Sequence, residues 1–253
     1  MAMSRDLILQ QLQDHGSMSV RDLAVAAGVS PATAHRQLTR LEDMGIVIRT
    51  RGGAQIVRQE SLAPPFEQRI GAAVEAKQAI AQQALQLVPV GGALFLDSST
   101  TCLYAARAIN RSIKREVTIV TNSPTILSEF SSPAARVIGT PGELDLSLRA
   151  LGGPWTVEFL EGLNLDVAFI SGFGMTMDGW LTTTKRLIVD VLQQAIRRST
   201  GVYVLLDSTK LGRRGLLDIV DTHQVAGMIV DRGITGDQVR HLKSSGVRVV
   251  VAS

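Results

Sequence analysis

Cysteine, histidine and aromatic residues are scarce in this sequence of 253 residues. The single cysteine, Cys102, excludes an internal disulfide framework and fits a reducing compartment, so we expect a cytoplasmic protein. The four histidines, at positions 15, 35, 223 and 241, do not have the spacing of metal ligands. We therefore expect neither a metal nor another cofactor. Aromatic residues make up only 4% of the chain, which predicts a mostly aliphatic core.

Long apolar runs and a strong charge imbalance are also missing. No run approaches the roughly 18 consecutive apolar residues of a membrane-spanning helix, so we expect no membrane partner. The formal net charge of +3 is compatible with a nucleic-acid partner but does not require one. The length fits one large domain, or a small domain followed by a medium one.

Residues 1–58 carry the pattern of a winged helix-turn-helix. Apolar positions predict a short amphipathic helix that ends near His15, and Ser19 can cap a second helix. A third helix opens at Ser30-Pro31, with serine as the N-cap and proline at the first helical position. Two strands around a turn at 50–53 would add the wing. In such a fold the third helix enters the major groove of DNA.

Polar residues stand where double-stranded DNA would lie. On the third helix they would contact base edges, and wing arginines would meet phosphates or the minor groove. Residues 1–60 hold seven arginines against six acids, so the basic character is local rather than global. The alternative is a three-helix interaction module with a solvated charged face. The predicted DNA-binding residues are Ser30, Thr33, His35, Arg36, Gln37, Arg40, Arg49 and Arg51.

Residues 59–68 read as a linker because they contain the Pro64-Pro65 pair and show no periodicity. A long helix is predicted over 70–88, and aliphatic runs then alternate with helical segments up to residue 253. Such alternation predicts a Rossmann-like α/β domain over 69–253, with a parallel sheet covered on both faces. The expected strands are 93–96, 117–120, 136–139, 167–170, 202–206, 226–230 and 247–251.

Polar loops follow several of these strands. They begin at Asp97, Thr121, Ser171 and Asp207, and the first contains four consecutive hydroxyl residues before a helical segment. Ligands of open α/β sheets bind at the carboxyl ends of the strands, and helix N-termini favour anions. An ordinary strand–turn–helix corner is the alternative for any one loop, but several polar loops on one edge predict a binding site.

Both segments resemble the DeoR family of bacterial transcriptional regulators. In the first, 28–38 and the wing sequence 49–54 are similar to the family's DNA-binding signature, although Ala34, His35 and Gln37 depart from it. In the second, Asp97 with Thr100-Thr101, residues 121–123 and residues 207–210 are similar to motifs of its effector domain. Ser99 stands where the family usually has glycine. The resemblance implies an effector domain related in fold to ribose-5-phosphate isomerase.

The resemblance also implies a phosphorylated sugar as effector and release of operator DNA when it binds, hence a repressor of carbohydrate-metabolism genes. Serine and threonine groups suit a phosphate, Lys210 can add a point charge, and Asp97 and Asn122 suit sugar hydroxyls. We expect a homo-dimer or homo-tetramer that assembles through the second domain. The predicted effector-binding residues are Asp97, Ser98, Ser99, Thr100, Thr101, Thr121, Asn122, Gly172, Gly174, Lys185 and Lys210.

Two other classes of protein compete with this interpretation. The second domain could be a sugar-phosphate isomerase, with Asp97 or Asp207 as general base and Lys210 stabilising an enediolate. The attached DNA-reading segment argues against an enzyme, so no catalytic residue is assigned. A nucleoid-type DNA binder without a ligand is disfavoured by the low net charge and the polar strand-end loops.

Overall fold

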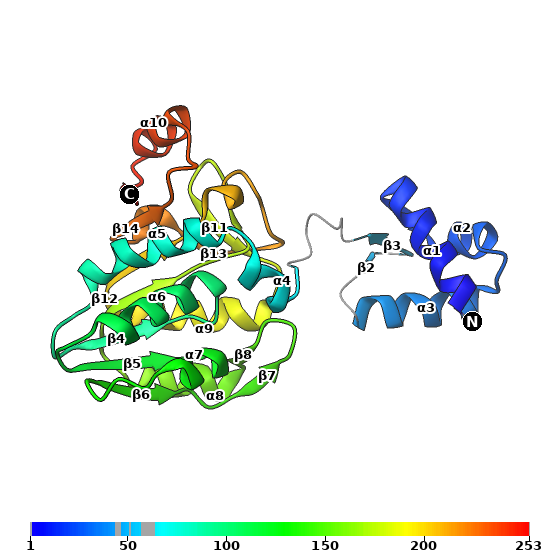
Figure 1. Ribbon diagram of the computed structural model, residues 1–253. Coiled ribbons are helices and arrows are strands. Elements are labelled where there is room, and N and C mark those ends of the chain that lie inside the picture. The colour runs from blue at the N-terminus through cyan, green and yellow to red at the C-terminus, as the bar shows by residue number, and fades with distance from the viewer. Residues whose placement is uncertain (1, 44–46, 51, 57–63, 253) are drawn as a thin grey trace. The chain divides into compact units, whose positions relative to one another are not determined.

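The computed structural model describes residues 2–43, 47–50, 52–56 and 64–252 (Figure 1). The chain divides into two units, residues 1–63 and residues 64–253, and each is described by itself below. Among the described residues, no hydrophobic cluster contains members of both units. Each unit therefore has a core of its own.

The first unit has the predicted helix-turn-helix and wing. The serine caps are in place: Ser19 Oγ accepts from the amide of Asp22 at 3.1 Å, and Ser30 Oγ accepts from the amide of Thr33 at 3.2 Å. One short strand, β1, was not predicted. The elements are α1 (Ala2–His15), β1 (Ser17–Ser19), α2 (Val20–Ala26), α3 (Pro31–Asp43), β2 (Val47–Thr50) and β3 (Gly53–Ile56).

The wing is a three-stranded antiparallel sheet with β3 in the centre, flanked by β1 and β2. Gly52 lies in the hairpin turn with φ of 86°, a left-handed conformation that glycine adopts without strain. Its carbonyl accepts from the amide of Val20 at 3.0 Å, which ties the turn to the start of α2. The predicted DNA contact Arg51 lies outside the described residues.

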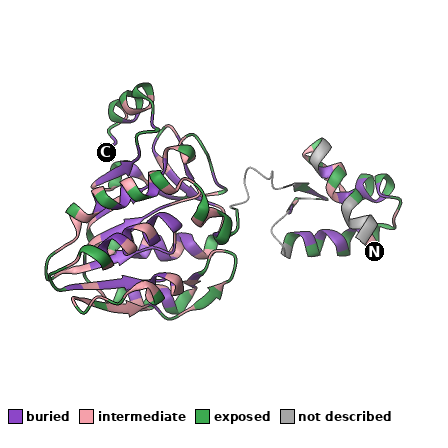
Figure 2. Cartoon of the chain, viewed as in Figure 1, coloured by how far each residue is buried: buried purple, intermediate pink, exposed green. Residues whose placement is uncertain are grey.

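Helix packing in the first unit depends on a small aliphatic core (Figure 2). Its side chains repeat at helical spacing along α1 and α3, so each amphipathic helix turns one apolar stripe inward. The members with no exposed surface include Ile8, Leu12, Leu23, Leu38 and Leu41.

The second unit is built on the predicted parallel sheet. All seven predicted strands are present, and they are joined in the order β15-β14-β12-β9-β4-β5-β6. Every neighbouring pair in this sheet is parallel, which confirms the α/β fold class. The strands are β4 (Ala93–Leu96), β5 (Val117–Thr121), β6 (Ala135–Gly139), β9 (Leu165–Ile170), β12 (Ser199–Leu205), β14 (Gly227–Val230) and β15 (Val249–Val251).

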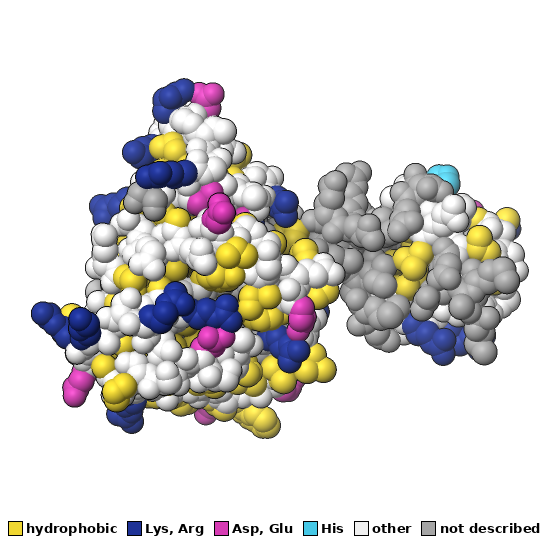
Figure 3. All heavy atoms as spheres, in the orientation of Figure 1, with side chains coloured by type: hydrophobic (Ala, Val, Ile, Leu, Met, Phe, Trp, Pro, Cys, Tyr) yellow, Lys and Arg dark blue, Asp and Glu magenta, His cyan; other side chains and the backbone are white. Residues whose placement is uncertain are grey.

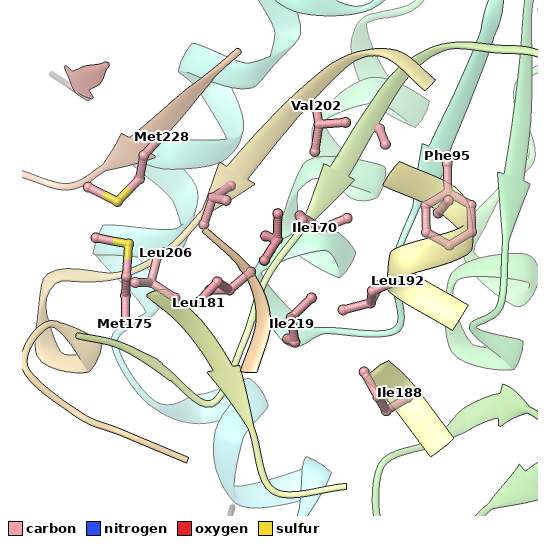
Figure 4. Close-up of a cluster of buried hydrophobic side chains, with 14 of the residues drawn as sticks. Phe95, Ile170, Met175, Leu181, Ile188, Leu192, Val202, Leu206, Ile219 and Met228 are labelled. Carbon is pink, nitrogen blue, oxygen red and sulfur yellow. The ribbon is translucent and has the colours of Figure 1, made fainter. Parts of the chain in front are cut away.

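Helices cover both faces of this sheet, as predicted (Figure 1). Successive residues of a strand point to opposite faces, so Leu94 and Leu96 pack toward α5 and α6, whereas Phe95 packs toward α9. Figure 4 shows Phe95, Ile170 and Val202 in the second of these layers, with Ile188 and Leu192 of α9. The helices are α4 (Phe66–Gly71), α5 (Val74–Ala84), α6 (Thr100–Ser112), α7 (Pro124–Glu129), α8 (Pro154–Glu161), α9 (Arg186–Arg197) and α10 (Gly236–Ser244).

The single helix predicted over 70–88 is wrong. The chain forms α4, then an extended residue at Ala72 and a left-handed residue at Ala73, and only then α5. The Lys77 ammonium donates to the carbonyls of Arg69 and Ala72, which satisfies carbonyl groups freed by this break. Gly71, the last residue of α4, is of the residue type that often ends a helix, and the two carbonyls that Lys77 binds hold the chain on either side of it.

Two antiparallel elements were also not predicted. A hairpin of β7 (Glu143–Asp145) and β8 (Ala150–Gly152) follows β6. A small sheet in the order β10-β11-β13 packs against the large one, through Leu181 and Ile219 among others (Figure 4). Its strands are β10 (Gly174–Met175), β11 (Trp180–Thr183) and β13 (Leu217–Asp221). Their two- to five-residue lengths are too short to give a clear period.

Separate cores predict separate unfolding. Leu38→Ala should destabilise only the first unit, by about 2–5 kcal/mol, because a buried leucine is truncated in a core that the second unit does not share. Leu94→Ala is the matched change in the second unit. Urea titration followed by unit-specific fluorescent labels should show each variant moving one transition. A common shift of both transitions by either variant would contradict independent cores.

Candidate functional site

Four of the predicted polar loops lie on one edge of the large sheet. Because β4, β5, β9 and β12 are parallel, the loops that follow them, beginning at Asp97, Asn122, Ser171 and Leu206, leave the sheet at the same edge. The strand order reverses between β4 and β9, since the chain runs outward from β4 in one direction and from β9 in the other. Ligands of doubly wound sheets bind at such a switch point.

Asp97 joins the loops on the two sides of the switch point. Its Oδ1 accepts from the amide of Ser99 at 2.7 Å, and its Oδ2 accepts from the amide of Ser171 at 2.6 Å. The side chain is buried, and burial raises the pKa of Asp97 above its ordinary value while these hydrogen bonds oppose the rise. Asp97 therefore fixes the geometry of the edge, with its remaining lone pairs available to a hydroxyl.

Helix α6 begins directly at this edge. Ser99 is its N-cap, with Oγ accepting from the amide of Cys102 at 3.1 Å. The amides of Thr100 and Thr101 lie in the first turn, where an α-helix offers no acceptor of its own. The helix dipole adds a partial positive charge at the same point, so this end of α6 favours an anion.

Unpartnered polar atoms gather at the same edge. Buried N–H, C=O and hydroxyl groups in folded proteins nearly always have a hydrogen-bond partner, so each exception needs a reason. Within the described ranges, every buried side-chain nitrogen or oxygen without a protein partner belongs to the loops after β4, β5, β6 and β9, or to Arg69 of α4. The atoms are Thr100 Oγ1, Thr101 Oγ1, Asn122 Oδ1, Thr140 Oγ1, Ser171 Oγ and Arg69 Nη2.

Lys210 supplies a cation from the loop after β12. Its ammonium donates to the carbonyl of Gly172 at 3.1 Å and lies 3.8 Å from Oδ2 of Asp207. The side chain is only 14% exposed. Burial lowers the pKa of Lys210, and the charge of Asp207 opposes this most strongly. Lys210 is thus a partly desolvated charge, held by one carboxylate.

Two further cations, Arg69 and Lys77, were not predicted as site residues. Burial lowers the pKa of Arg69, while Asp97 is the nearby acid that opposes the change most. Burial also lowers the pKa of Lys77, to about 8, and Lys210 is the cation that contributes most to the shift. The charges of Arg69, Lys77 and Lys210 therefore act on one another. In the sequence Arg69 directly follows the predicted linker and Lys77 lies in the helix predicted over 70–88, where nothing distinguishes them.

Two predicted effector residues have structural partners. Thr121 Oγ1 donates to the carbonyl of Leu96 at 2.7 Å and accepts from the amide of Ser123 at 3.1 Å, so it ties β4 to the loop after β5. Asn122 Nδ2 donates to the carbonyl of Leu151 in β8 at 3.0 Å, which leaves its Oδ1 as the free group.

The remaining predicted residues divide between the edge and its surroundings. Ser98 is buried beside Asp97, and Gly172 provides the carbonyl that Lys210 binds. Gly174 lies in β10, where a Cβ would come within 2.5 Å of the backbone oxygen of Arg213. Lys185 is 44% exposed and pairs with Asp145 of the β7–β8 hairpin at 3.4 Å. The contacts of Gly174 and Lys185 are thus with the small sheet and the hairpin.

The outer face of α3 presents most of the predicted DNA-binding residues. His35, Arg36 and Arg40 are exposed, Thr33 is half-buried, and Ser30 acts as the cap. Arg36 Nη2 donates to Thr33 Oγ1 at 3.3 Å. The prediction that Gln37 lies on this face is wrong: it is only 5% exposed. Residues 34, 38 and 41 form the inward stripe of α3, and position 37 falls on its side of the helix.

The wing and the reading helix are directly linked. Arg49 of β2 lies with Nη2 2.9 Å from Nδ1 of His35, so the guanidinium donates to the unprotonated ring nitrogen. On the second unit, Figure 3 shows Lys and Arg side chains interspersed with Asp and Glu over the visible face. That face carries mixed charge, whereas α3 and β2 bring His35, Arg36 and Arg49 together.

Two absences concern the described part of the chain. It contains no group of three His, Cys, Asp or Glu side chains placed to hold a metal ion. None of its helices is long and apolar enough to cross a membrane.

A winged helix-turn-helix unit joined to an α/β unit with an anion-directed edge defines a DNA-binding regulator with a sensor domain. Comparison with known proteins agrees. The chain matches the DeoR-like helix-turn-helix domain over residues 5–60 and the DeoR C terminal sensor domain over residues 72–232. It belongs to the DeoR family of transcriptional regulators.

Full-length relatives support this assignment. The HTH-type transcriptional regulator GlpR of Haloferax volcanii is 30% identical, over 96% of this chain and 94% of its own length. The HTH-type transcriptional repressor GlcR of Bacillus subtilis is 28% identical, over 89% of this chain and 86% of its own. Ribose 5-phosphate isomerase A of Methanocaldococcus jannaschii is 15% identical over 55% of each chain, with a TM-score of 0.42, a level that carries no functional argument.

The depressed pKa of Lys77, about 8, makes stability depend on pH. Between pH 8 and about 10.5 the unfolded chain keeps a proton on Lys77 that the folded chain has lost, so wild-type stability should rise with pH. Relative to Lys77→Met, the gain between pH 7.5 and 9.5 should be about 2 kcal/mol. Urea unfolding at pH 7.5, 8.5 and 9.5 measures it. Exposed Lys114→Met is the control and should parallel the wild type; a pH-independent difference for Lys77→Met would refute the assignment.

Proposed function

We propose that the chain represses carbohydrate-metabolism genes and leaves its operator when a phosphorylated sugar binds the carboxyl edge of the large sheet. One observation carries the proposal: the buried hydroxyls of Thr100 and Thr101 have no protein partner and stand in the first turn of α6. A phosphate has oxygen acceptors for these hydroxyls and for the amides beside them.

Different groups around the start of α6 would bind the two parts of the proposed ligand, its phosphate and its sugar. The amides and hydroxyls of 98–101 would hold the phosphate, and Lys210 would add charge from the opposite side of the switch point. Asp97 and Asn122 would meet sugar hydroxyls, since Asp97 accepts and the free Oδ1 of Asn122 also accepts. This assignment leaves no role for a metal or cofactor.

Repression by release requires two states with different ligand affinity. A sugar phosphate weakens operator binding only to the extent that it binds the DNA-free state more tightly. The name of the relative GlcR, a transcriptional repressor, supports repression as the sign. Because its partner is operator DNA, we propose that the protein acts in the cytoplasm.

Assembly through the second unit is part of the proposal, as a homo-dimer or homo-tetramer. Large apolar side chains are exposed on and beside the β7–β8 hairpin: Leu144, Leu146 and Trp155 are 47%, 72% and 66% exposed. We propose that these side chains belong to the interface, since contiguous exposed apolar surface is typical of interfaces between proteins. A symmetric oligomer would place two reading helices on repeated half-sites.

An isomerase is the less favourable alternative. Each oxygen of Asp97 accepts a backbone amide, and these hydrogen bonds stabilise the carboxylate form and so oppose its action as a base. Asp207 accepts from the hydroxyl of Thr209 and pairs with Lys210, so its carboxylate already has two partners. Turnover of aldose phosphates by the full chain would favour this alternative.

The effector site can be tested with glucose 6-phosphate, fructose 1-phosphate and glycerol 3-phosphate, with glucose, fructose and glycerol as controls. Binding to the folded state raises the melting temperature by mass action. One of these phosphates should raise the melting temperature of the wild type. Lys210→Met should weaken the binding of that compound by about 10–100-fold, as expected for a lost charge-assisted hydrogen bond. Lys185→Met, the exposed counterpart, should change affinity less than threefold. Equal losses in both variants would argue against the edge.

The DNA-binding face can be tested on a duplex that the full-length protein selects from a random-sequence pool. Arg36→Ala should weaken binding by about 5–150-fold, because one base contact contributes about 1–3 kcal/mol. Fluorescence anisotropy at several salt concentrations measures it. Exposed Gln10→Ala on α1 is the control and should bind as the wild type does. Unchanged affinity and salt slope for Arg36→Ala would exclude Arg36 from the interface.

A further inference from the structure

Helix α4 is the first element of the second unit, and the chain enters this unit at Pro64 (Figure 1). The left-handed residue Ala73 separates α4 from α5, so the short helix is held by its own contacts rather than by helical continuity. Those contacts determine where the chain from the DNA-binding unit enters.

Arg69 lies between this entry point and the edge of the sheet. Its Nε donates to the carbonyl of Pro64 at 2.9 Å, and its guanidinium lies 5.6 Å from the ring centroid of Phe66. Its Nη2 is buried and has no protein partner among the described residues. The guanidinium of Arg69 thus binds the Pro64 carbonyl through Nε, whereas its Nη2 has no acceptor within the described part of the chain.

The free nitrogen belongs to the same charge cluster as the proposed phosphate site. The acid that acts most strongly on Arg69 is Asp97, and Arg69 in turn contributes to the environment of Lys210. The same cluster holds three features that stabilise an anion, namely a helix N-terminus, unpartnered hydroxyls and a second cation, so the guanidinium of Arg69 is suited to an anionic group.

The other contacts of α4 lead to the same loops. Tyr104 of α6 donates its hydroxyl to the carbonyl of Ile70 at 3.2 Å. Glu67 pairs with Arg149 at 2.9 Å, and Arg149 immediately precedes β8, the strand that Asn122 binds through Leu151. Helix α4 thus contacts α6 directly, and it is connected to the loop of Asn122 through Arg149 and β8.

We propose that Arg69 binds the anionic group of the effector through Nη2 while Nε holds the Pro64 carbonyl, so that effector occupancy is transmitted to the chain that leads to the DNA-binding unit. This inference rests on the proposed function. Arg69 is then both a ligand contact and the coupling residue of the switch. Lysine at this position keeps the charge but replaces the planar fork of separated donors with one compact ammonium, so we expect it to lose one of the two partners.

Hydrogen–deuterium exchange of the full-length protein tests the coupling, with 20 mM inorganic phosphate as the probe and chloride at equal ionic strength as the reference. In the wild type, phosphate should slow exchange at least threefold in two peptides, one covering the first turn of α6 and one covering α4. In Arg69→Lys the α6 peptide should still slow, whereas the α4 peptide should change less than 1.5-fold.

Operator release gives a second readout. With the selected duplex, saturating phosphate should weaken DNA binding at least tenfold for the wild type and less than twofold for Arg69→Lys. Arg107→Lys is the matched control, since Arg107 likewise lies over an aromatic ring, that of Tyr104 at 5.5 Å, and pairs with Glu129. It should behave as the wild type. Melting temperatures without phosphate verify that both variants fold.

The outcomes separate this inference from the function on which it rests. Protection of α6 without α4 in the wild type, or full protection and release in Arg69→Lys, would overturn the role of Arg69 and leave the effector site standing. If phosphate protects neither peptide in the wild type, the phosphate site itself fails, and the inference fails with it.

Discussion

The binding edge depends on one carboxylate that accepts two backbone amides. Asp97 lies where the strand order reverses, and its bonds to Ser99 and Ser171 hold together loops that are 72 residues apart in sequence. An aspartate at the end of a buried strand is costly to desolvate, and the amides compensate for that cost. Because the start of α6 is fixed by the same bonds, the placement of its hydroxyls follows from Asp97.

The large sheet was predictable because its strands are aliphatic runs that are buried on both faces. Their polar ends were also visible, so Asp97, Asn122 and Lys210 could be chosen from the sequence alone. Short elements without a period, such as the β7–β8 hairpin, could not be predicted. The prediction for Gln37 is wrong for a different reason. A polar residue beside the apolar stripe of α3 is expected to be exposed, but packing buries this one.

Arg69 and Lys77 show the limit of sequence reasoning at the site. Lys77 belongs to the helix predicted over 70–88 and Arg69 directly precedes it, and the chain breaks between them at Ala72–Ala73. Lys77 stabilises that break through two carbonyls while its own charge is placed near Lys210. The positions of Arg69 and Lys77, and the roles proposed for them, depend on contacts that the sequence pattern does not indicate.

The separate hydrophobic cores have an evolutionary consequence. Mutations that repack one unit leave the side chains of the other core untouched, so operator preference and metabolite preference can drift independently. Gene recombination between relatives can also join a new DNA-binding unit to an existing sensor unit without disrupting either hydrophobic core. Residues around Pro64, where the second unit begins, must remain compatible in such a hybrid.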